Sequence, residues 1–124
     1  MHLLTIMEKQ RAVRLETRKR DGTWVATPVS IAVDGEHAYF RTWNVSGKAK
    51  RLRNFPQVRV APSTLAGKPT GPLTAGTAHL LDDVQATRAR ELLAAKYPVL
   101  QGRLVPAYHR LRGWQTLHYR LELH

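Results

Sequence analysis

The first third of the chain shows the alternation of hydrophobic and polar residues that is typical of β-strands. The alternation is imperfect over residues 12–17, whereas the run 23–33 is rich in Val, Thr and Ile. Asp21-Gly22 separates these runs, and this dipeptide is a strong signal for a tight hairpin turn. A second turn at 34–37 leads into the strand-like run 38–42. The pattern therefore predicts three antiparallel strands joined by tight turns.

The rest of the chain switches between helical and strand-like patterns. Gly and Pro residues between 66 and 72 indicate a turn. In the longer helical pattern an aspartate can cap the N-terminus and a proline can end the helix. Its buried side is expected to carry Val84, Ala89, Leu92, Leu93 and Tyr97. The expected elements are a helix at 46–54, strands at 57–63 and 73–81, a helix from Asp82 or Asp83 to Pro98, and a strand at 113–123.

This order of elements predicts a mostly β fold of the α+β class. Six antiparallel strands with tight turns, one short helix and one longer helix suit a small barrel. A plain β-sandwich is the competing architecture. No linker, internal repeat or low-complexity segment divides the chain, so we expect residues 1–124 to form a single domain.

The composition excludes several kinds of chemistry. The 124 residues are 43% hydrophobic, which is enough for one core, and none is a cysteine. Disulfides, thiolate catalysis and Cys-based zinc sites are therefore excluded, and a reducing, cytoplasmic location is expected. No apolar stretch approaches the roughly 20 residues of a membrane span. The N-terminus also lacks the basic region of a signal peptide, so we expect no membrane partner.

The net charge is the strongest signal in the composition. Lys and Arg number 20 and Asp and Glu number 9, which gives a formal net charge of +11. Such a surface attracts polyanions: nucleic acid, an anionic membrane or a phosphorylated cofactor. A basic protein with no anionic partner is the simpler interpretation.

Much of this charge lies at the expected helix 46–54. Ser46 suits the N-cap position, and Gly47 lets a ligand approach the backbone. A helix N-terminus attracts phosphate, and Lys48 adds a full charge to it. Lys50 is the second choice as a ligand, whereas helical spacing directs Arg51 away from the core-facing side. The alternative is a capped helix whose basic face is only solvated.

Four segments of the chain form a specific pattern when taken together. In order, they are DGTWVATPV at 21–29, DGEHAYFRT at 34–42, SGKAKRLRNFPQVRVAP at 46–62 and GKPTGPLTAGTAHLL at 67–81. Together they resemble the flavin and deazaflavin split β-barrel proteins, and most of all the pyridoxamine-5'-phosphate-oxidase class of probable coenzyme F420-dependent enzymes of actinobacterial type. The resemblance extends from about Leu15 to Leu81 and more loosely beyond.

The resemblance implies a six-stranded split barrel of the FMN-binding type. It implies a homodimer with the cofactor at the interface, Ser46 and Lys48 as phosphate ligands, and Thr42 in the same region. It also implies that Thr27, Pro28 and Val29 contact the tricyclic ring, largely through backbone atoms. Related oxidases carry an arginine just before the phosphate lysine, where this chain has Gly47. This departure favours the deazaflavin branch over the oxidase branch.

The implied activity is transfer of a hydride between F420 and a small, electron-poor organic substrate. The cofactor carries that chemistry, so we name no catalytic residue and no metal ligand. His79, His109 and His118 are expected at the surface or at an interface. The acidic tail of F420 suits the basic charge, and candidate tail contacts are Gln101, Arg103, Arg110 and Arg112.

Three alternatives stay open at this point. The barrel could bind FMN, which also has one phosphate group. It could have lost activity and only carry a cofactor. A basic nucleic-acid-binding module is the third, and it is less favoured because aromatics make up only 7% of the chain.

Overall fold

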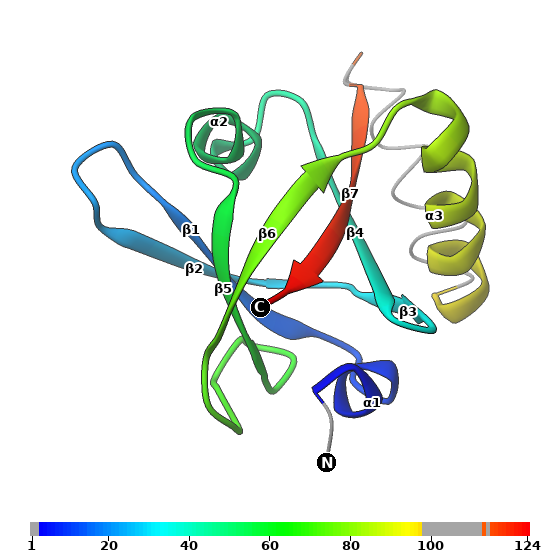
Figure 1. Cartoon of the computed structure of the whole chain (residues 1–124), viewed down its shortest axis with the longest axis horizontal. Coiled ribbons are helices and arrows are strands. Elements are labelled where there is room, and N and C mark those ends of the chain that lie inside the picture. The colour runs from blue at the N-terminus through cyan, green and yellow to red at the C-terminus, as the bar shows by residue number, and fades with distance from the viewer. Residues whose placement is uncertain (1–2, 98–112, 114) are drawn as a thin grey trace.

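One curled antiparallel sheet forms the frame of the molecule (Figure 1). The computed structural model describes residues 3–97, 113 and 115–124. Neighbouring strands pair in the order β2-β1-β5-β6-β7-β4-β3. The strands are β1 (Val13–Arg18), β2 (Trp24–Val29), β3 (Ala32–Asp34), β4 (His37–Trp43), β5 (Gln57–Pro62), β6 (Thr74–Leu80) and β7 (Thr116–Leu123). The helices within these residues are α1 (Leu3–Glu8), α2 (Gly47–Asn54) and α3 (Asp83–Lys96).

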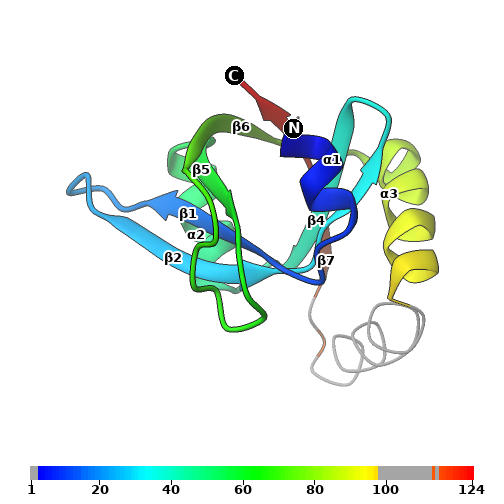
Figure 2. The same cartoon turned by 90° about the horizontal axis from the view of Figure 1, so that it is seen from below.

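The curvature of the sheet gives an incomplete barrel rather than a sandwich. The two views at right angles show the strands wrapping around one interior, with α3 on the outer side of β3, β4 and β7 (Figure 2). The expected mostly β, barrel-like fold is therefore confirmed, with seven strands in the described ranges instead of six. None of the helices in those ranges is long and apolar enough to cross a membrane.

The hairpin expected at Asp21-Gly22 is present. The Asp21 carboxylate accepts hydrogen bonds from the backbone N–H and the hydroxyl of Thr23. Gly22 has a φ of +90°, which residues with a side chain rarely adopt. The turn sets the register that pairs Arg18 with Trp24 and Val13 with Val29.

The run 23–33 forms two strands, so the expectation of one continuous strand was wrong. The segment leaves β1 after Val29 and pairs with β4 from Ala32 onward. At the break, the backbone of Ile31 bonds to the end of α3. The Ile31 N–H donates to Tyr97 Oη (3.3 Å), and Ile31 O accepts from Lys96 Nζ (2.6 Å). The extra strand thus results from a tertiary contact.

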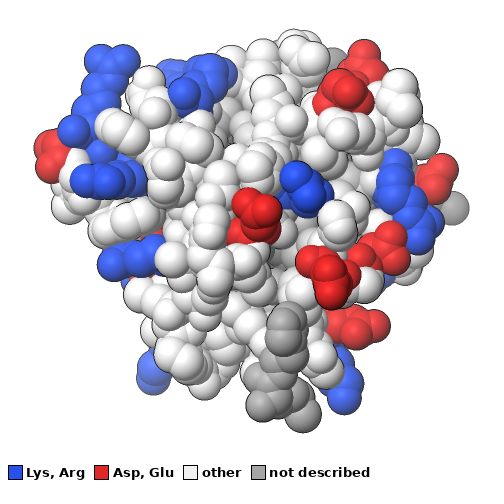
Figure 3. Space-filling model, in the orientation of Figure 1, with Lys and Arg blue, Asp and Glu red and all other residues white. Residues whose placement is uncertain are grey.

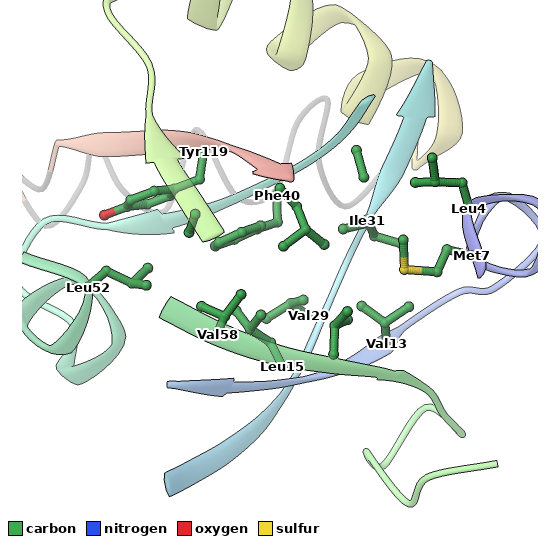
Figure 4. Packing of buried hydrophobic residues seen from close by; sticks show 14 residues of the cluster. Leu4, Met7, Val13, Leu15, Val29, Ile31, Phe40, Leu52, Val58 and Tyr119 are labelled. Carbon is green, nitrogen blue, oxygen red and sulfur yellow. The ribbon is translucent and has the colours of Figure 1, made fainter. Parts of the chain in front are cut away.

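The hydrophobic core fills the interior of the curled sheet (Figure 4). Phe40 and Tyr119 stack with their ring centroids 5.1 Å apart. The unexpected helix α1 contributes Leu4 and Met7 to this core. Leu52 of α2 also reaches it, so the short basic helix is fixed to the barrel by its apolar side.

Helix α3 has the expected cap but a different buried face. Asp82 is its N-cap and forms a reciprocal capping box with Gln85. Ala86, Ala89 and Leu93 are buried, whereas Val84 is 83% exposed. Val84 precedes Leu93 by nine residues, which at about 100° per residue places it on the opposite face. The expectation that Val84 is buried was therefore wrong, and Pro98 lies outside the described residues.

Candidate functional site

Two buried hydroxyl groups lie at the start of α2. Ser46 is the N-cap residue, as expected, and its Oγ accepts a hydrogen bond from Ala49 N (3.0 Å). Thr42 Oγ1, at the end of β4, lies 2.9 Å from Ser46 Oγ. A serine hydroxyl has two acceptor sites and one proton. If Thr42 donates to Ser46, both acceptor sites are occupied and the Ser46 proton can be donated to an anion.

Lys48 follows these hydroxyls in the first turn of α2 and is half-buried. Burial, assisted by the positive charge of Arg51, lowers the pKa of Lys48 to about 8. A lysine with such a pKa is poorly solvated as a cation, and a nearby anion would restore the stability of its charged form. We call Thr42, Ser46 and Lys48 the anion cradle.

The expectation that Arg51 points to solvent was wrong. Arg51 is half-buried, and its Nε donates a 2.6 Å hydrogen bond to Thr17 Oγ1 in β1. Its long side chain folds back along the helix surface toward the barrel. Arg53 is exposed. Lys50 is also exposed, so its role as a ligand stays a prediction.

The cations of α2 have no acidic partner within the described part of the chain. The helix sequence GKAKRLRN contains no acidic residue. The ion pairs found there are Arg14–Glu16, Arg59–Glu16, His79–Glu122 and Arg88–Asp34, and none involves α2. The charge of this helix is therefore not neutralised by an ion pair inside the described fold.

The second predicted region, residues 27–29, lies on β2 at an edge of the sheet. Oγ1 of Thr27 is buried and has no hydrogen-bond partner among the described residues. Pro28 is exposed and Val29 is buried, and both line a cavity of about 650 Å³. We call it the β2 cavity. Its lining includes Lys9, Arg11, Ala12, Pro28, Val29 and Tyr97.

The anion cradle and the β2 cavity lie toward opposite ends of one strand pair. Near the cradle, Thr17 accepts the hydrogen bond from Arg51 and pairs with Val25 of β2. At the cavity end, Val13 pairs with Val29. Four residues of strand span roughly 13 Å at about 3.3 Å per residue. Thr27 lies midway. An elongated ligand with an anionic end and a flat end could contact both regions along β2.

Basic side chains gather in one region of the face that Figure 3 shows. Figure 3 shows Lys and Arg gathered over the β1–β2 hairpin and α2, while most acidic side chains on this face lie over α3 and its surroundings. Basic residues in the first region are Arg18, Lys19, Arg20, Lys48, Lys50, Arg51 and Arg53. The hairpin and α2, next to the cradle, therefore form the more basic side of this face.

The histidines form no metal site in the described ranges, where no group of three or more His, Cys, Asp or Glu side chains could hold an ion. His79 is partly exposed and contacts Glu122 (3.2 Å). His118 is only 4% exposed, so the expectation of a surface or interface residue was wrong for it. Strand alternation places its side chain on the opposite side of β7 from the core residues Tyr119 and Leu121, and α3 packs against β7. His109 and the expected tail contacts Gln101, Arg103, Arg110 and Arg112 lie outside the described residues.

The fold is shared with several solved structures. A Listeria innocua protein described as a putative pyridoxamine 5'-phosphate oxidase matches with a TM-score of 0.67 and 18% identity, covering 97% of this chain and 89% of that one. An F420 reductase matches with a TM-score of 0.61 and 15% identity, covering 100% and 94%. An FAD-binding protein from Mesorhizobium loti matches with a TM-score of 0.65 and 17% identity, covering 96% and 83%.

The chain has the split β-barrel fold. It spans only 50% of the length of one similar structure, a protein of unknown function from Agrobacterium tumefaciens (TM-score 0.70, 19% identity, 95% of this chain covered). No protein-family profile matches the sequence. The search of curated proteins also found no significant match. The TM-scores establish a common split-barrel architecture, and the low identities leave the ligand to be argued from the site.

Sequence reasoning missed Arg51 and Thr17 as neighbours of the site. The available signal was the spacing of Gly47 and Arg51, because residues four apart lie on the same helix face. The sequence showed that the two positions were adjacent on the helix. It gave no indication that β1 would supply a hydroxyl to hold the guanidinium.

Proposed function

We propose that this protein is an oxidoreductase that binds a phosphate-bearing cofactor of the flavin type along β2. The observation that carries the proposal is Lys48, a half-buried cation beside the capped N-terminus of α2, with no acidic partner in the described fold. The structural neighbours support the same class of ligand, since one is an F420 reductase and another an FAD-binding protein.

The residues of the anion cradle fit a phosphate group. Phosphate offers several strong acceptor oxygens, and the cradle offers an ammonium group, a hydroxyl proton and the first backbone N–H groups of α2. Ser46 and Thr42 are already fixed by a hydrogen bond to each other. Little rearrangement would be needed on binding, which lowers the entropic penalty.

The residues of β2 fit the polar edge and flat face of a tricyclic ring. The buried Thr27 hydroxyl could satisfy its hydrogen-bonding potential on a ring heteroatom. Pro28 and Val29 offer apolar surface at the β2 cavity. The cofactor supplies the hydride-transfer chemistry when bound. The role of these residues is to bind the ring, orient it and keep water from its buried side.

F420 is the cofactor we favour. Its acidic tail would find an attractive surface on the basic side of the protein (Figure 3). The proposed substrate is a small, electron-poor organic molecule that accepts or returns a hydride next to the ring. FMN is the second candidate. It has the phosphate that the cradle would bind and the ring that the β2 cavity would bind, but it lacks the acidic tail of F420.

We also propose a homodimer with the cofactor at its interface. β2 is at the edge of the sheet, so a ring lying against it would be covered by this chain on one side only. A second copy would cover the other side and exclude water from the ring. Sedimentation at micromolar concentration with F420 present should give a dimer mass, and a monomer under saturating F420 would contradict this part of the proposal.

A titration with three ligands tests the cofactor assignment. The protein is titrated separately with F420, FMN and a labelled single-stranded oligonucleotide, and fluorescence polarisation is followed at low and physiological salt. F420 should bind more tightly than FMN, and part of that preference should fade with salt, because exposed charges are screened over roughly 8–10 Å. The contribution of the half-buried cradle should persist.

The outcomes separate the alternatives. Tight binding of FMN without binding of F420 would reassign the protein to the FMN branch. Oligonucleotide binding should collapse at physiological salt as counterions compete. Salt-resistant oligonucleotide binding with neither cofactor bound would exclude the oxidoreductase proposal.

A further inference from the structure

Arg51 fills space that a side chain at position 47 would otherwise need. A Cβ built on Gly47 would lie 2.9 Å from Nη1 of Arg51, closer than such atoms normally approach. Positions 47 and 51 lie on the same face of α2 because they are four residues apart. The guanidinium can therefore lie against the first turn of the helix only because position 47 is a glycine.

A buried residue of β1 holds this guanidinium in place. Nε of Arg51 donates to Oγ1 of Thr17, and Thr17 is only 1% exposed. This bond uses one of five N–H donors of the side chain. No other hydrogen bond and no ion pair of the Arg51 side chain is found within the described ranges. Up to four N–H donors are thus left for a ligand.

Arg51 and Lys48 are two cations held close together at the start of one helix. Burial lowers the pKa of Arg51, and the charge of Arg51 contributes to the lowered pKa of Lys48. Holding two partly dehydrated cations together is unfavourable unless an anion lies within reach of both. A carboxylate of the protein could have filled this role, but α2 has none.

We infer that Arg51 is a second anchor for the phosphate group, bonded to it from the space above Gly47 and positioned by Thr17. This inference rests on the proposed function, since it assigns a further ligand to the same cradle. A planar guanidinium can give two parallel hydrogen bonds to a phosphate, and Lys48 adds a point charge. Related oxidases carry an arginine at the position of Gly47. In this chain Arg51, one helical turn later, would supply the guanidinium in its place.

The test compares two ligands that differ only in the phosphate group. FMN and riboflavin are titrated into the wild-type protein and into Arg51→Gln, with Arg53→Gln as the matched control on the exposed side of α2. Arg51→Gln should weaken FMN binding by about tenfold or more, the usual effect of losing a charge-assisted hydrogen bond. Riboflavin binding should not change, and Arg53→Gln should bind both ligands as the wild type does.

Two results would overturn the inference. One is an unchanged FMN affinity in Arg51→Gln. The other is an equal loss of FMN and riboflavin affinity, which would show that Arg51 acts only on the structure of the site.

Gly47→Ala provides a second variant that keeps Arg51. The added methyl group must displace the end of the arginine side chain, which is flexible, so the fold should persist. FMN affinity should fall while riboflavin affinity stays constant. An FMN affinity equal to that of the wild type would contradict the position assigned to the guanidinium.

A measurement with inorganic phosphate, which needs no cofactor, tests this inference independently of the proposed function. Inorganic phosphate at millimolar concentration should raise the melting temperature of the wild type and Arg53→Gln, and raise it less in Arg51→Gln. This difference would support Arg51 as a phosphate ligand even if neither FMN nor F420 bound. Equal stabilisation of all three proteins would count against the inference whether or not a cofactor bound.

Discussion

Two groups of charged side chains in this protein lie on opposite faces of β1 and have opposite electrostatic arrangements. On one face Glu16, 4% exposed, accepts hydrogen bonds from Arg14 Nε (2.9 Å) and Arg59 Nε (2.8 Å). Arg59 also lies 4.3 Å from the centre of the Trp24 ring. We call these four residues the Glu16 cluster. On the other face, within the described residues, Arg51 bonds only to the neutral Thr17, beside Lys48.

The presence or absence of a carboxylate distinguishes two kinds of charged side chain. Those of the first kind stabilise the fold, and those of the second kind are available to bind an anionic ligand. In the Glu16 cluster a carboxylate compensates both arginines, so their charge is used within the protein. At the anion cradle two cations are partly dehydrated without a carboxylate, which is unfavourable for the protein alone. Residues of the first kind should affect stability, and residues of the second kind should affect ligand binding.

Glu16→Gln should give the largest loss of stability. It leaves two arginines without their carboxylate, and we expect the free energy of unfolding to fall by about 2–3 kcal/mol. This is less than for a fully buried pair, because both arginines are partly exposed to water. Urea denaturation measures the change. Glu122→Gln, which removes an exposed carboxylate, is the control and should have no measurable effect on stability.

Lys48→Met should give the reverse pattern. FMN or F420 affinity should fall by about 1.5–3 kcal/mol, while the unliganded protein should be as stable as the wild type or more stable. Calorimetric titration and urea denaturation give the two quantities. Lys50→Met, on the exposed side of the same helix, is the control. If Lys50→Met weakened binding as much as Lys48→Met, both lysines would belong to the site.

Raising the pH should weaken cofactor binding through Lys48. The free protein loses the Lys48 proton near pH 8, and a bound phosphate would raise this pKa. Affinity should therefore decline from pH 7 to 9, while a phosphate monoester stays dianionic above its second pKa of about 6. Calorimetric titration with FMN at pH 7, 8 and 9 tests this, and Lys48→Arg should show a flatter profile. A decline of equal size in Lys48→Arg would assign the effect to another group.

The same titration has the opposite effect on the stability of the unliganded protein. The unfolded lysine has a pKa of about 10.5 and the folded one a pKa of about 8. Between these values the unfolded state binds more protons, so the contribution of Lys48 to the free energy of unfolding rises with pH. Comparison with Lys48→Met between pH 7.5 and 10 isolates this contribution.

Trp24→Phe should give the smallest effect. Phe presents a weaker ring face to Arg59, and we expect a loss of about 0.5 kcal/mol in the free energy of unfolding. Cofactor affinity should be unchanged, because Trp24 belongs neither to the anion cradle nor to the lining of the β2 cavity. A clear loss of FMN affinity in Trp24→Phe would mean that the Glu16 cluster and the cofactor site are coupled.

The sequence by itself determined the features that depend on neighbouring residues. The Asp21-Gly22 turn, the Ser46 cap and the Asp82 cap all appear where their residues predict them. Each is made by backbone and side-chain groups only two or three positions apart, so no distant part of the chain is needed. For the same reason the position of Lys48 in the first turn of a helix was enough to predict it as a phosphate ligand.

Only the tertiary structure decided which distant residues meet. The split of 23–33 into two strands depends on bonds from Ile31 to Lys96 and Tyr97, more than 60 positions away. The orientation of Arg51 depends on Thr17, 34 positions before it. The β2 cavity likewise joins segments near Arg11, Val29 and Tyr97. Local patterning fixes turns and helix caps, but contacts between elements are set by strand pairing and core packing, which no short window of sequence contains.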